Sequence, residues 1–386
     1  MKKSILLLSI LCFALLKAQD NRYAIITGAP FLRISPDARS GGLGDQGVAT
    51  SPDEYSQYWN PSKYVFGSSY SGIGVSYTPY MNKLTNDVFL LNGTFYTFLG
   101  EEERSTVAAS IYYFNMGEIQ LNELIGNDIV EKGTSKPNEF AIDLSYGLKL
   151  ADVYSMAVTA RYIRSDLFNN VDNSYAQTKA ANTFAVDVTG YFQSNKTDVF
   201  KNYQGRWRAG WGIFNMGPKL DYSDSQENKS YLPTNLRLGV GYDLFFDSEN
   251  KLGLTFEATK LLVPAPKDVT DSNGTTHTEV PDKSFISGMF SSFGNKDAGK
   301  EITYSIAGEY TFKNAFAFRT GYFYENPDKG GRQYITLGAG LKYQSFGIDF
   351  SYLITTASVN NALDNTLRFG LTWNFGGDTS SSYDNL

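Results

Sequence analysis

The sequence predicts an all-β protein: a 14-stranded antiparallel transmembrane β-barrel with an N-terminal hatch. Three observations lead to this fold class. Aromatic residues make up 15% of the chain, while charged residues make up only 19%. Segments of about 9–11 residues alternate between apolar and polar side chains, which is the length and the pattern of a barrel strand. Tight and long connections then alternate between these segments along the chain.

Length, charge and composition exclude several other classes of protein. The 386 residues carry a net charge of −6 and no concentrated basic face, so we expect no nucleic-acid partner. After the N-terminus, no run approaches the ~20 apolar residues of a membrane helix, and this aromatic content is foreign to disordered chains. One cysteine cannot form a disulfide framework.

The first 18 residues read as a signal peptide that is cleaved before Gln19. A basic start at Lys2 and Lys3 precedes the apolar run Ser4–Leu16, which is too short to span a membrane. The only cysteine, Cys12, leaves with this segment. We therefore expect a cysteine-free mature chain in the outer membrane of a Gram-negative cell, with both termini in the periplasm.

Residues 19–71 differ in composition and read as a hatch inside or beneath the barrel. Gly and Pro interrupt any long strand, and a short helix is expected at Pro52–Tyr58 with Ser51 as its N-cap. The glycines of a G-x-G-x-x-G pattern also lie here: Gly42, Gly44 and Gly47. That pattern binds dinucleotides only between a strand and a helix, which are not predicted here. A tight glycine turn close to the barrel wall is the better interpretation.

The strand pattern is clearest at Phe140–Leu150, where six apolar side chains alternate with small or charged ones. Lipid-facing and lumen-facing positions must alternate in a transmembrane strand, so this segment suits a barrel wall. Fourteen such segments make up a barrel over residues 72–375: 72–79, 86–99, 105–116, 139–150, 154–165, 182–193, 205–216, 234–246, 251–262, 301–312, 315–325, 334–343, 346–355 and 366–375. An even number places both ends of the barrel on one side of the membrane, which makes residues 376–386 a periplasmic tail.

The connections between the segments set the orientation. Short ones, such as 151–153 and 344–345, alternate with long ones, such as 117–138 and 263–300. Outer-membrane barrels have short periplasmic turns and long external loops. The alternative is a soluble β-sandwich or propeller with the same strand lengths, but its outer face would be polar.

Charged residues on the inward face are predicted to pair across strands. A tight turn at 151–153 sets Asp143 opposite Arg161, and the turn at 313–315 sets Glu309 opposite Arg319. Further charges face inward on the same register: Arg206, Arg208, Arg237, Glu257, Lys342, Asp349 and Arg368. Because the signs are mixed, a network that holds a packed lumen is favoured over a selective conduction path, which usually shows a ring of one sign.

Two runs in the hatch resemble a known superfamily. Arg39–Ala49, with its glycine motif, is followed by Trp59, Asn60 and Pro61, and this combination resembles the hatch of the FadL-like fatty-acid-channel superfamily. The resemblance implies a fourteen-stranded barrel, which matches the independent count. Ser62 follows Asn60-Pro61 where that family has alanine, which weakens a transfer of fatty-acid transport.

Longer strings resemble one branch of this superfamily, the PorV-like (LptO) proteins of type IX secretion: Tyr23–Arg39, Tyr70–Met81 and Pro233–Gly239. The resemblance implies a non-enzymatic protein at the lateral gate of a large outer-membrane translocon barrel. It would bind the C-terminal signal domains of secreted cargo and carry cargo to an attachment complex that contains a sortase-like peptidase. Contact with lipid or lipopolysaccharide is also implied. A FadL-like channel for hydrophobic small molecules is the alternative.

The longest connection carries a candidate surface for partners. Its apolar residues follow the spacing of one helical stripe: Phe285, Ile286, Met289, Phe290 and Phe293. The stripe either folds over the barrel mouth as a lid or presents itself to a partner, because interface cores use such aromatic and Met side chains. Ile119, Leu121, Leu124 and Ile125 in the connection 117–138 form a weaker candidate.

Catalysis and metal binding find little support in the residues. His277 is the only histidine and lies in a polar loop, so we expect no catalytic residue. Asp268, Asp271 and Asn273 do not match the EF-hand spacing and are explained by a turn. Without clusters of His or Cys, we expect neither a metal nor a cofactor.

Overall fold

The structure is a computed structural model that describes residues 24–81, 87–125, 128–167, 179–200, 203–222, 229–271, 273, 276–295, 297–357 and 365–379. The expected signal peptide, Met1–Ala18, and the last part of the expected tail, residues 380–386, lie outside the described residues. None of the described helices is long and apolar enough to cross a membrane.

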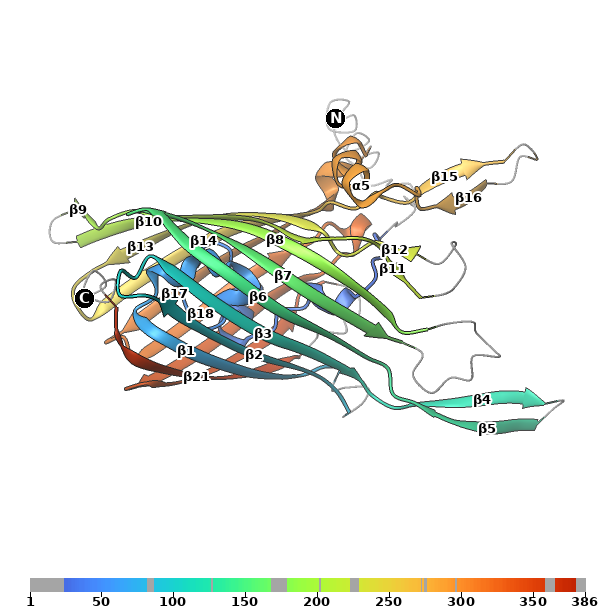
Figure 1. Ribbon diagram of the computed structural model, residues 1–386, viewed down its shortest axis with the longest axis horizontal. Helices are drawn as coiled ribbons and strands as arrows, with labels where there is room; N and C mark the ends of the chain where they lie inside the picture. The colour runs from blue at the N-terminus through green and yellow to red at the C-terminus, as the bar shows by residue number, and fades with distance from the viewer. Residues whose placement is uncertain are drawn as a thin grey trace, which may run out of the picture.

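Fourteen antiparallel strands form a closed barrel (Figure 1). The ring closes where β1 pairs with β21 and where β10 pairs with β13. The barrel strands are β1 (Ser69–Pro79), β2 (Val88–Leu99), β3 (Ser105–Met116), β6 (Asn138–Ala151), β7 (Tyr154–Asp166), β8 (Ala181–Gln193), β10 (Tyr203–Met216), β13 (Asn235–Phe245), β14 (Asn250–Leu261), β17 (Ile302–Phe312), β18 (Phe316–Tyr324), β19 (Gln333–Tyr343), β20 (Phe346–Thr355) and β21 (Leu367–Asp378). The predicted fold class is confirmed, and a sandwich or propeller is excluded.

The strand ends differ from the predicted ones by a few residues. β1 begins at Ser69 rather than at residue 72, and β21 continues to Asp378, because these two residues pair at the seam of the barrel. The start of the expected tail is therefore part of the wall. The connection 194–204 holds a short strand, β9 (Thr197–Phe200), that pairs with the beginning of β10.

The strands expose apolar side chains outward and bury polar ones inward. In β6, Ile142, Leu144 and Tyr146 are 49%, 63% and 49% exposed, while Asp143 and Ser145 are buried. This distribution is the reverse of that in a water-soluble barrel. Outward-facing apolar side chains are favourable when lipid surrounds the wall.

The tight turns lie at one end of the barrel and the long connections at the other (Figure 1). We call these the turn end and the loop end. The loop end carries the following elements: β4 (Ile119–Ile125), β5 (Asp128–Ser135), β11 (Leu220–Asp221), β12 (Lys229–Ser230), β15 (Lys267–Thr270), β16 (Thr276–Glu279), α5 (Phe285–Ser291), η4 (Ser292–Gly294), η5 (Ala298–Glu301) and η6 (Pro327–Lys329).

Residues 24–68, which we call the inner segment, run inside the ring of strands (blue in Figure 1). Its short helices are η1 (Pro30–Arg33), α2 (Ala38–Gly41), α3 (Ser56–Trp59) and η2 (Pro61–Phe66). Helix α2 contacts β19, β20 and β21, whereas η2 contacts β3, β6, β7 and β8 on the other side of the ring. The inner segment therefore crosses the lumen from wall to wall.

The inner segment starts at the loop end and leaves at the turn end. Ile25 packs against Tyr231, Val263 and Ala265 beside the long connections, and β1 begins at the opposite end. The expected N-terminus of the mature chain, residues 19–23, lies outside the described residues, so the expectation of two periplasmic termini stays a prediction. A segment that precedes the first strand can lie in either direction inside a barrel, whatever the number of strands.

The helix expected at Pro52–Tyr58 is shorter than predicted. Helix α3 begins only at Ser56, and Ser51 does not cap it. The Oγ of Ser51 instead accepts a hydrogen bond from Arg39, while the Asp53 carboxylate accepts one from Ser56. These polar contacts take the place of the expected cap by Ser51.

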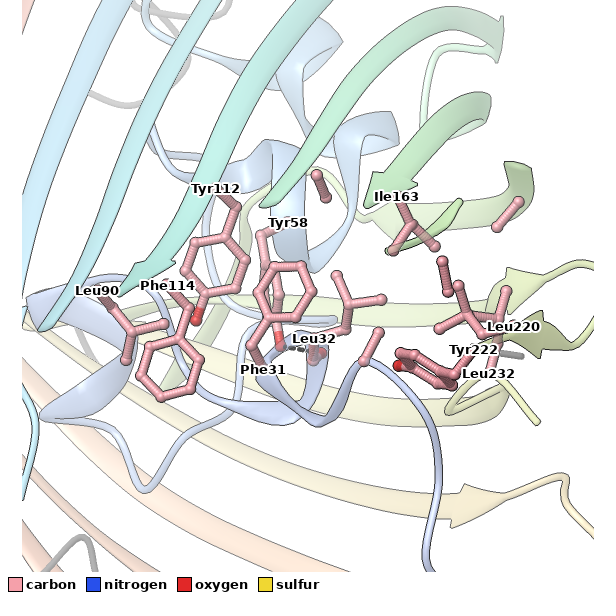
Figure 2. Close-up of a cluster of buried hydrophobic side chains, with 14 of the residues drawn as sticks. Phe31, Leu32, Tyr58, Leu90, Tyr112, Phe114, Ile163, Leu220, Tyr222 and Leu232 are labelled. Carbon is pink, nitrogen blue, oxygen red and sulfur yellow. Dashed lines mark hydrogen bonds between the residues drawn. The ribbon is translucent and has the colours of Figure 1, made fainter. Parts of the chain in front are cut away.

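An apolar cluster fixes the inner segment near the loop end (Figure 2). Phe31 and Leu32 of η1 are almost completely buried, and the Phe31 ring lies 5.3 Å from that of Tyr112 in β3. The hydroxyl of Tyr58 donates to the Leu32 carbonyl at 2.7 Å. Burying such a side chain contributes about 1.5–3 kcal/mol, so this cluster holds η1 firmly to one wall.

Candidate functional site in the barrel lumen and at the loop end

The three motif glycines let the inner segment approach its neighbours closely. A Cβ at Gly42 would lie 3.0 Å from the Gly338 Cα, and one at Gly47 would lie 2.3 Å from the Trp59 ring. Gly44 has a φ of +72° and lies against the backbone of Tyr322. Each glycine therefore serves a different close contact, and over residues 24–41 no strand precedes the motif as a dinucleotide site would require.

The Trp-Asn-Pro part of the motif ties the inner segment to itself. The Trp59 Nε1 donates to the Asp37 carboxylate at 2.7 Å. The Asn60 amide donates to the carbonyl of Val48 at 2.9 Å, and Pro61 begins η2, where its missing N–H is harmless. These bonds hold residues 59–60 of the inner segment against residues 37 and 48.

An ion network centred on Arg39 joins the inner segment to the wall near the turn end. The Arg39 guanidinium donates to both oxygens of Glu309, at 3.0 and 2.9 Å, and to Asp53 at 2.5 Å. Glu309 also accepts from Arg319 at 2.6 Å, which is the predicted cross-strand pair, and Arg319 reaches Asp349. All five groups are mostly buried, so removing one leaves its partner's charge uncompensated.

Two further contacts join the inner segment to the wall nearer the loop end. Asp45 pairs with the fully buried Arg368 at 3.2 Å and accepts from the Tyr334 hydroxyl at 2.6 Å. The Glu257 carboxylate accepts two successive backbone N–H groups, beginning with that of Gly47 at 2.8 Å. The wall thus recognises both side chains and backbone of the inner segment.

The other predicted pair belongs to the wall alone. Arg161 donates to Asp143 at 2.7 Å and also pairs with Asp187 at 3.0 Å. Asn215, at a bulge with a φ of 58°, bonds to both Arg161 and Asp187. The bulge was not predictable from alternation, because it places one extra residue in β10.

Two ionisable groups of the inner segment are completely buried. Burial lowers the pKa of the Lys63 ammonium to about 8, although Asp53 opposes this shift. Its Nζ donates to the Gly47 carbonyl at 2.9 Å and to the Thr50 hydroxyl at 3.0 Å. Burial and the nearby Asp53 carboxylate raise the pKa of Asp37 to about 6. Such packing indicates a dry and closely fitted segment.

The inner segment separates two cavities. One of about 80 Å³ lies toward the loop end and borders Tyr58, Trp59 and Arg237. The other, of about 180 Å³, lies toward the turn end and borders Arg39 and Lys342. The two cavities share no lining residue, so the described residues favour the packed network over a conduction path.

The predicted apolar stripe lies outside the lumen, on α5 and the turn that follows it. Ile286, Phe290 and Phe293 are 55%, 75% and 54% exposed, while Phe285 and Met289 are half-buried. Helix α5 packs through Gly288 against Tyr231 and Pro264 at the barrel rim. The candidate residues therefore fall into two places, the lumen and the loop-end surface, that are not one site.

Among the described residues, no group of three or more His, Cys, Asp or Glu side chains could hold a metal ion. His277 is half exposed in β16 and lies 3.6 Å from the Asp271 carboxylate. His277 and Asp271 both lie at the β15–β16 hairpin of the loop end, outside the buried charge network of the lumen.

The fold is shared with solved β-barrel proteins. The chain is similar to the toluene transporter TbuX of Ralstonia pickettii, with a TM-score of 0.51 and 12% identity over 89% of this chain and 99% of that one. It is also similar to the monoaromatic hydrocarbon channel CymD, with a TM-score of 0.50 and 11% identity over 89% and 98%. At such identities the likeness shows the fold alone. No curated protein matches the chain significantly.

The family follows from the sequence itself. Residues 17–268 match the family described as type IX secretion system protein PorV, and the chain belongs to that family. The match covers more than half of the chain, including the inner segment and the motif around Arg237. The chain is therefore an outer-membrane component of the type IX secretion system.

Proposed function

We propose that this protein receives secreted cargo at the outer-membrane translocon and carries it to the surface attachment complex. Its partners are the large translocon barrel, the C-terminal signal domains of cargo, and attachment proteins that include a sortase-like peptidase. The protein performs no catalysis in this scheme. Its long connections face the cell surface.

The observation that carries the proposal is the exposed apolar surface at the loop end of this chain, which belongs to the PorV family. Ile286, Phe290 and Phe293 present large side chains to solvent beyond the wall. Exposed apolar residues gathered beside polar rims mark interaction sites in soluble regions of proteins. Leu124 of the β4–β5 hairpin is also 70% exposed, which makes this hairpin a second point of contact.

The inner segment supports the proposal as a fixed hatch. It is tied to the wall by Arg39, Asp45 and the backbone N–H groups that Glu257 accepts. A carrier that binds folded cargo outside the barrel needs a closed lumen, because the outer membrane must stay sealed while cargo is exchanged. Lipid or lipopolysaccharide contact would then be made by the outer wall rather than by the lumen.

The alternative is a channel for hydrophobic small molecules, since TbuX is a toluene transporter and CymD a monoaromatic hydrocarbon channel. The cavity at the loop end offers Tyr58, Trp59 and Phe323 to such a ligand. However, Arg33, Arg237 and Glu325 line the same cavity, and burying these charges beside a hydrocarbon is costly. The secretion role is therefore favoured.

Deletion of the gene separates the two functions. The proposal expects cargo with its C-terminal signal to accumulate in the periplasm, measured by fractionation and immunoblotting. A pull-down from detergent-solubilised outer membrane should also recover a giant barrel together with cargo. Normal secretion combined with lost uptake of hydrophobic compounds would contradict the proposal and support the channel.

A further inference from the structure

Glu139, the second residue of β6, is a buried carboxyl group without a counter-charge. Its side chain is completely buried, and it forms no ion pair with any described residue, whereas Asp143, Asp187 and Asp243 each pair with an arginine. Its Oε2 atom is shielded from solvent and has no hydrogen-bond partner within the described ranges. An ionised carboxylate is costly in such surroundings, so the packing suits the neutral acid.

The residues directly around Glu139 carry no charge. Phe114 of β3 and Ser165 of β7 lie opposite it in the ladder, and the backbone N–H of Phe31 faces its carboxyl group. Phe31 and Phe114 both belong to the apolar cluster near the loop end (Figure 2). Neither an N–H group nor a serine hydroxyl supplies the full positive charge that a buried carboxylate needs.

The titratable groups on the surrounding elements are engaged elsewhere. The charged ones form other ion pairs: Arg33 with Glu325, Lys136 with Glu118, Arg161 with Asp143, and Arg164 with Asp166. The hydroxyls of Tyr58 and Tyr112 donate to the carbonyls of Leu32 and Ile34. The side chain of Lys179 is exposed. Tyr222 is the remaining titratable group, and it reaches Glu139 through Ser165.

Two hydrogen bonds join Glu139 to a connection at the loop end. The Ser165 hydroxyl donates to the Oε1 of Glu139 at 2.5 Å, and the Tyr222 hydroxyl donates to the Ser165 Oγ at 2.9 Å. Tyr222 follows β11 in the connection 217–233 and is itself buried. The position of this connection is therefore tied to the carboxyl group beneath it.

The same connection also holds α5. Asp221 of β11 pairs with Lys229 of β12, and Tyr231 follows β12 directly. The Tyr231 hydroxyl accepts from the backbone N–H of Lys283 at 2.8 Å, just before α5, and Gly288 of α5 lies against the Tyr231 ring. A continuous set of contacts thus runs from the buried carboxyl group to the exposed helix.

We propose that Glu139 is a pH-sensitive switch for the loop end: as the neutral acid it holds the connection 217–233 and α5 in place, and on ionisation it releases them. A carboxylate gains hydration only if its cover opens, and surface connections open more readily than barrel strands. The switch itself is independent of the secretion role. Only its consequence for partners, through the placement of α5, rests on the function proposed above.

The first test is hydrogen–deuterium exchange of the mature protein in detergent, followed by mass spectrometry. Wild type and Glu139→Gln are compared at the same pH, because the intrinsic pH dependence of exchange then cancels. Residues 217–222 and 229–233 should exchange equally in both at about pH 5 and about tenfold faster in the wild type at about pH 9. Equal rates at every pH would overturn the proposal.

A second pair of variants tests the hydrogen-bonded link. Tyr222→Phe removes the hydroxyl that reaches Ser165, so residues 217–222 should exchange about fivefold faster even at about pH 5. Tyr162→Phe is the matched control, because its hydroxyl donates to Asn182 on the exposed side of β7 and β8. Heat-modifiable gel mobility checks that both barrels are folded. The same change in both variants, or no change in Tyr222→Phe, would refute the link.

The wild type alone provides a measurement that needs no variant. The exchange of residues 217–222 is divided by that of the tight turn 151–153 in the same sample, from about pH 5 to about pH 9. A rising ratio is expected, together with faster exchange of residues 284–291 in α5. A constant ratio would contradict the switch, and an unchanged α5 beside a rising ratio would contradict its extension to the helix.

Discussion

The inner segment and the loop-end elements are built on opposite principles. Inside the barrel, charged groups such as Arg39 and Asp45 meet partners from the wall, and Lys63 is completely buried. At the loop end, α5 and the β4–β5 hairpin leave large apolar side chains in solvent. The lumen therefore combines paired charges with close packing, whereas the loop end leaves large apolar side chains exposed.

The largest effect is expected from breaking the ion network of the inner segment. Arg39→Ala leaves Glu309 and Asp53 with less compensation inside the lumen, which should lower the free energy of unfolding by about 3–5 kcal/mol. Urea unfolding in lipid vesicles measures this change. Lys136→Ala is the control, because its pair with Glu118 is exposed and should contribute less than about 1 kcal/mol. Similar losses in both variants would show that the inner segment is not specially held.

A steric change at the wall should have the next largest effect. A Cβ at Gly210 would lie 1.9 Å from the Val48 carbonyl oxygen of the inner segment, so Gly210→Ala should destabilise by about 1–3 kcal/mol. Gly93 is a matched strand glycine whose Cβ would find its nearest neighbour at 3.5 Å, so Gly93→Ala should change stability by less than about 0.5 kcal/mol. The same urea titration compares the two, and equal values would argue against tight packing of the segment.

Changes at the loop end should affect binding and leave the barrel stable. Replacing Ile286, Phe290 and Phe293 with Ser should reduce recovery of the translocon barrel in a pull-down by about tenfold or more, since interface truncations of about 1–2 kcal/mol each accumulate. Heat-modifiable gel mobility should be unchanged, because these side chains are already exposed. Leu124→Ser on the β4–β5 hairpin provides the comparison. Undiminished recovery in the triple variant would remove α5 from the interface.

The smallest effect on the structure is expected from single cysteine substitutions. Their accessibility to a labelling reagent shows at which end of the barrel the inner segment begins. The sequence has one cysteine, in the expected signal peptide, so new cysteines report alone. Ile26 is 84% exposed at the loop end, and Ile26→Cys should react with a membrane-impermeant maleimide on intact cells. Asn314→Cys, at a tight turn, should react only after the outer membrane is permeabilised. The reverse pattern would contradict the assigned orientation.

The strands were predictable because lipid and lumen impose opposite demands on alternate residues. The pattern in β6 marks the wall directly, and the tight turn after it sets Asp143 against Arg161. The contacts of the inner segment were not predictable in this way. Arg39 and Glu309 are 270 residues apart, and the inner segment has no periodicity that would show which wall it faces.

The same limit applied to Arg237, although alternation predicted that it faces inward. Glu257, on the neighbouring strand, accepts two backbone N–H groups of the inner segment, and no strand pattern encodes that contact. The aromatic positions around Arg237 come from α3 and β10, which meet only in the closed barrel.

The path of residues 24–68 has a consequence for how the molecule is made. The segment passes through the lumen from one mouth to the other and then becomes β1, which pairs with β21 at the seam. A segment that lies through a ring in this way is enclosed at the moment when the first and last strands pair. The barrel wall must therefore close around the inner segment during assembly, and the inner segment must already lie between the strands when β1 pairs with β21.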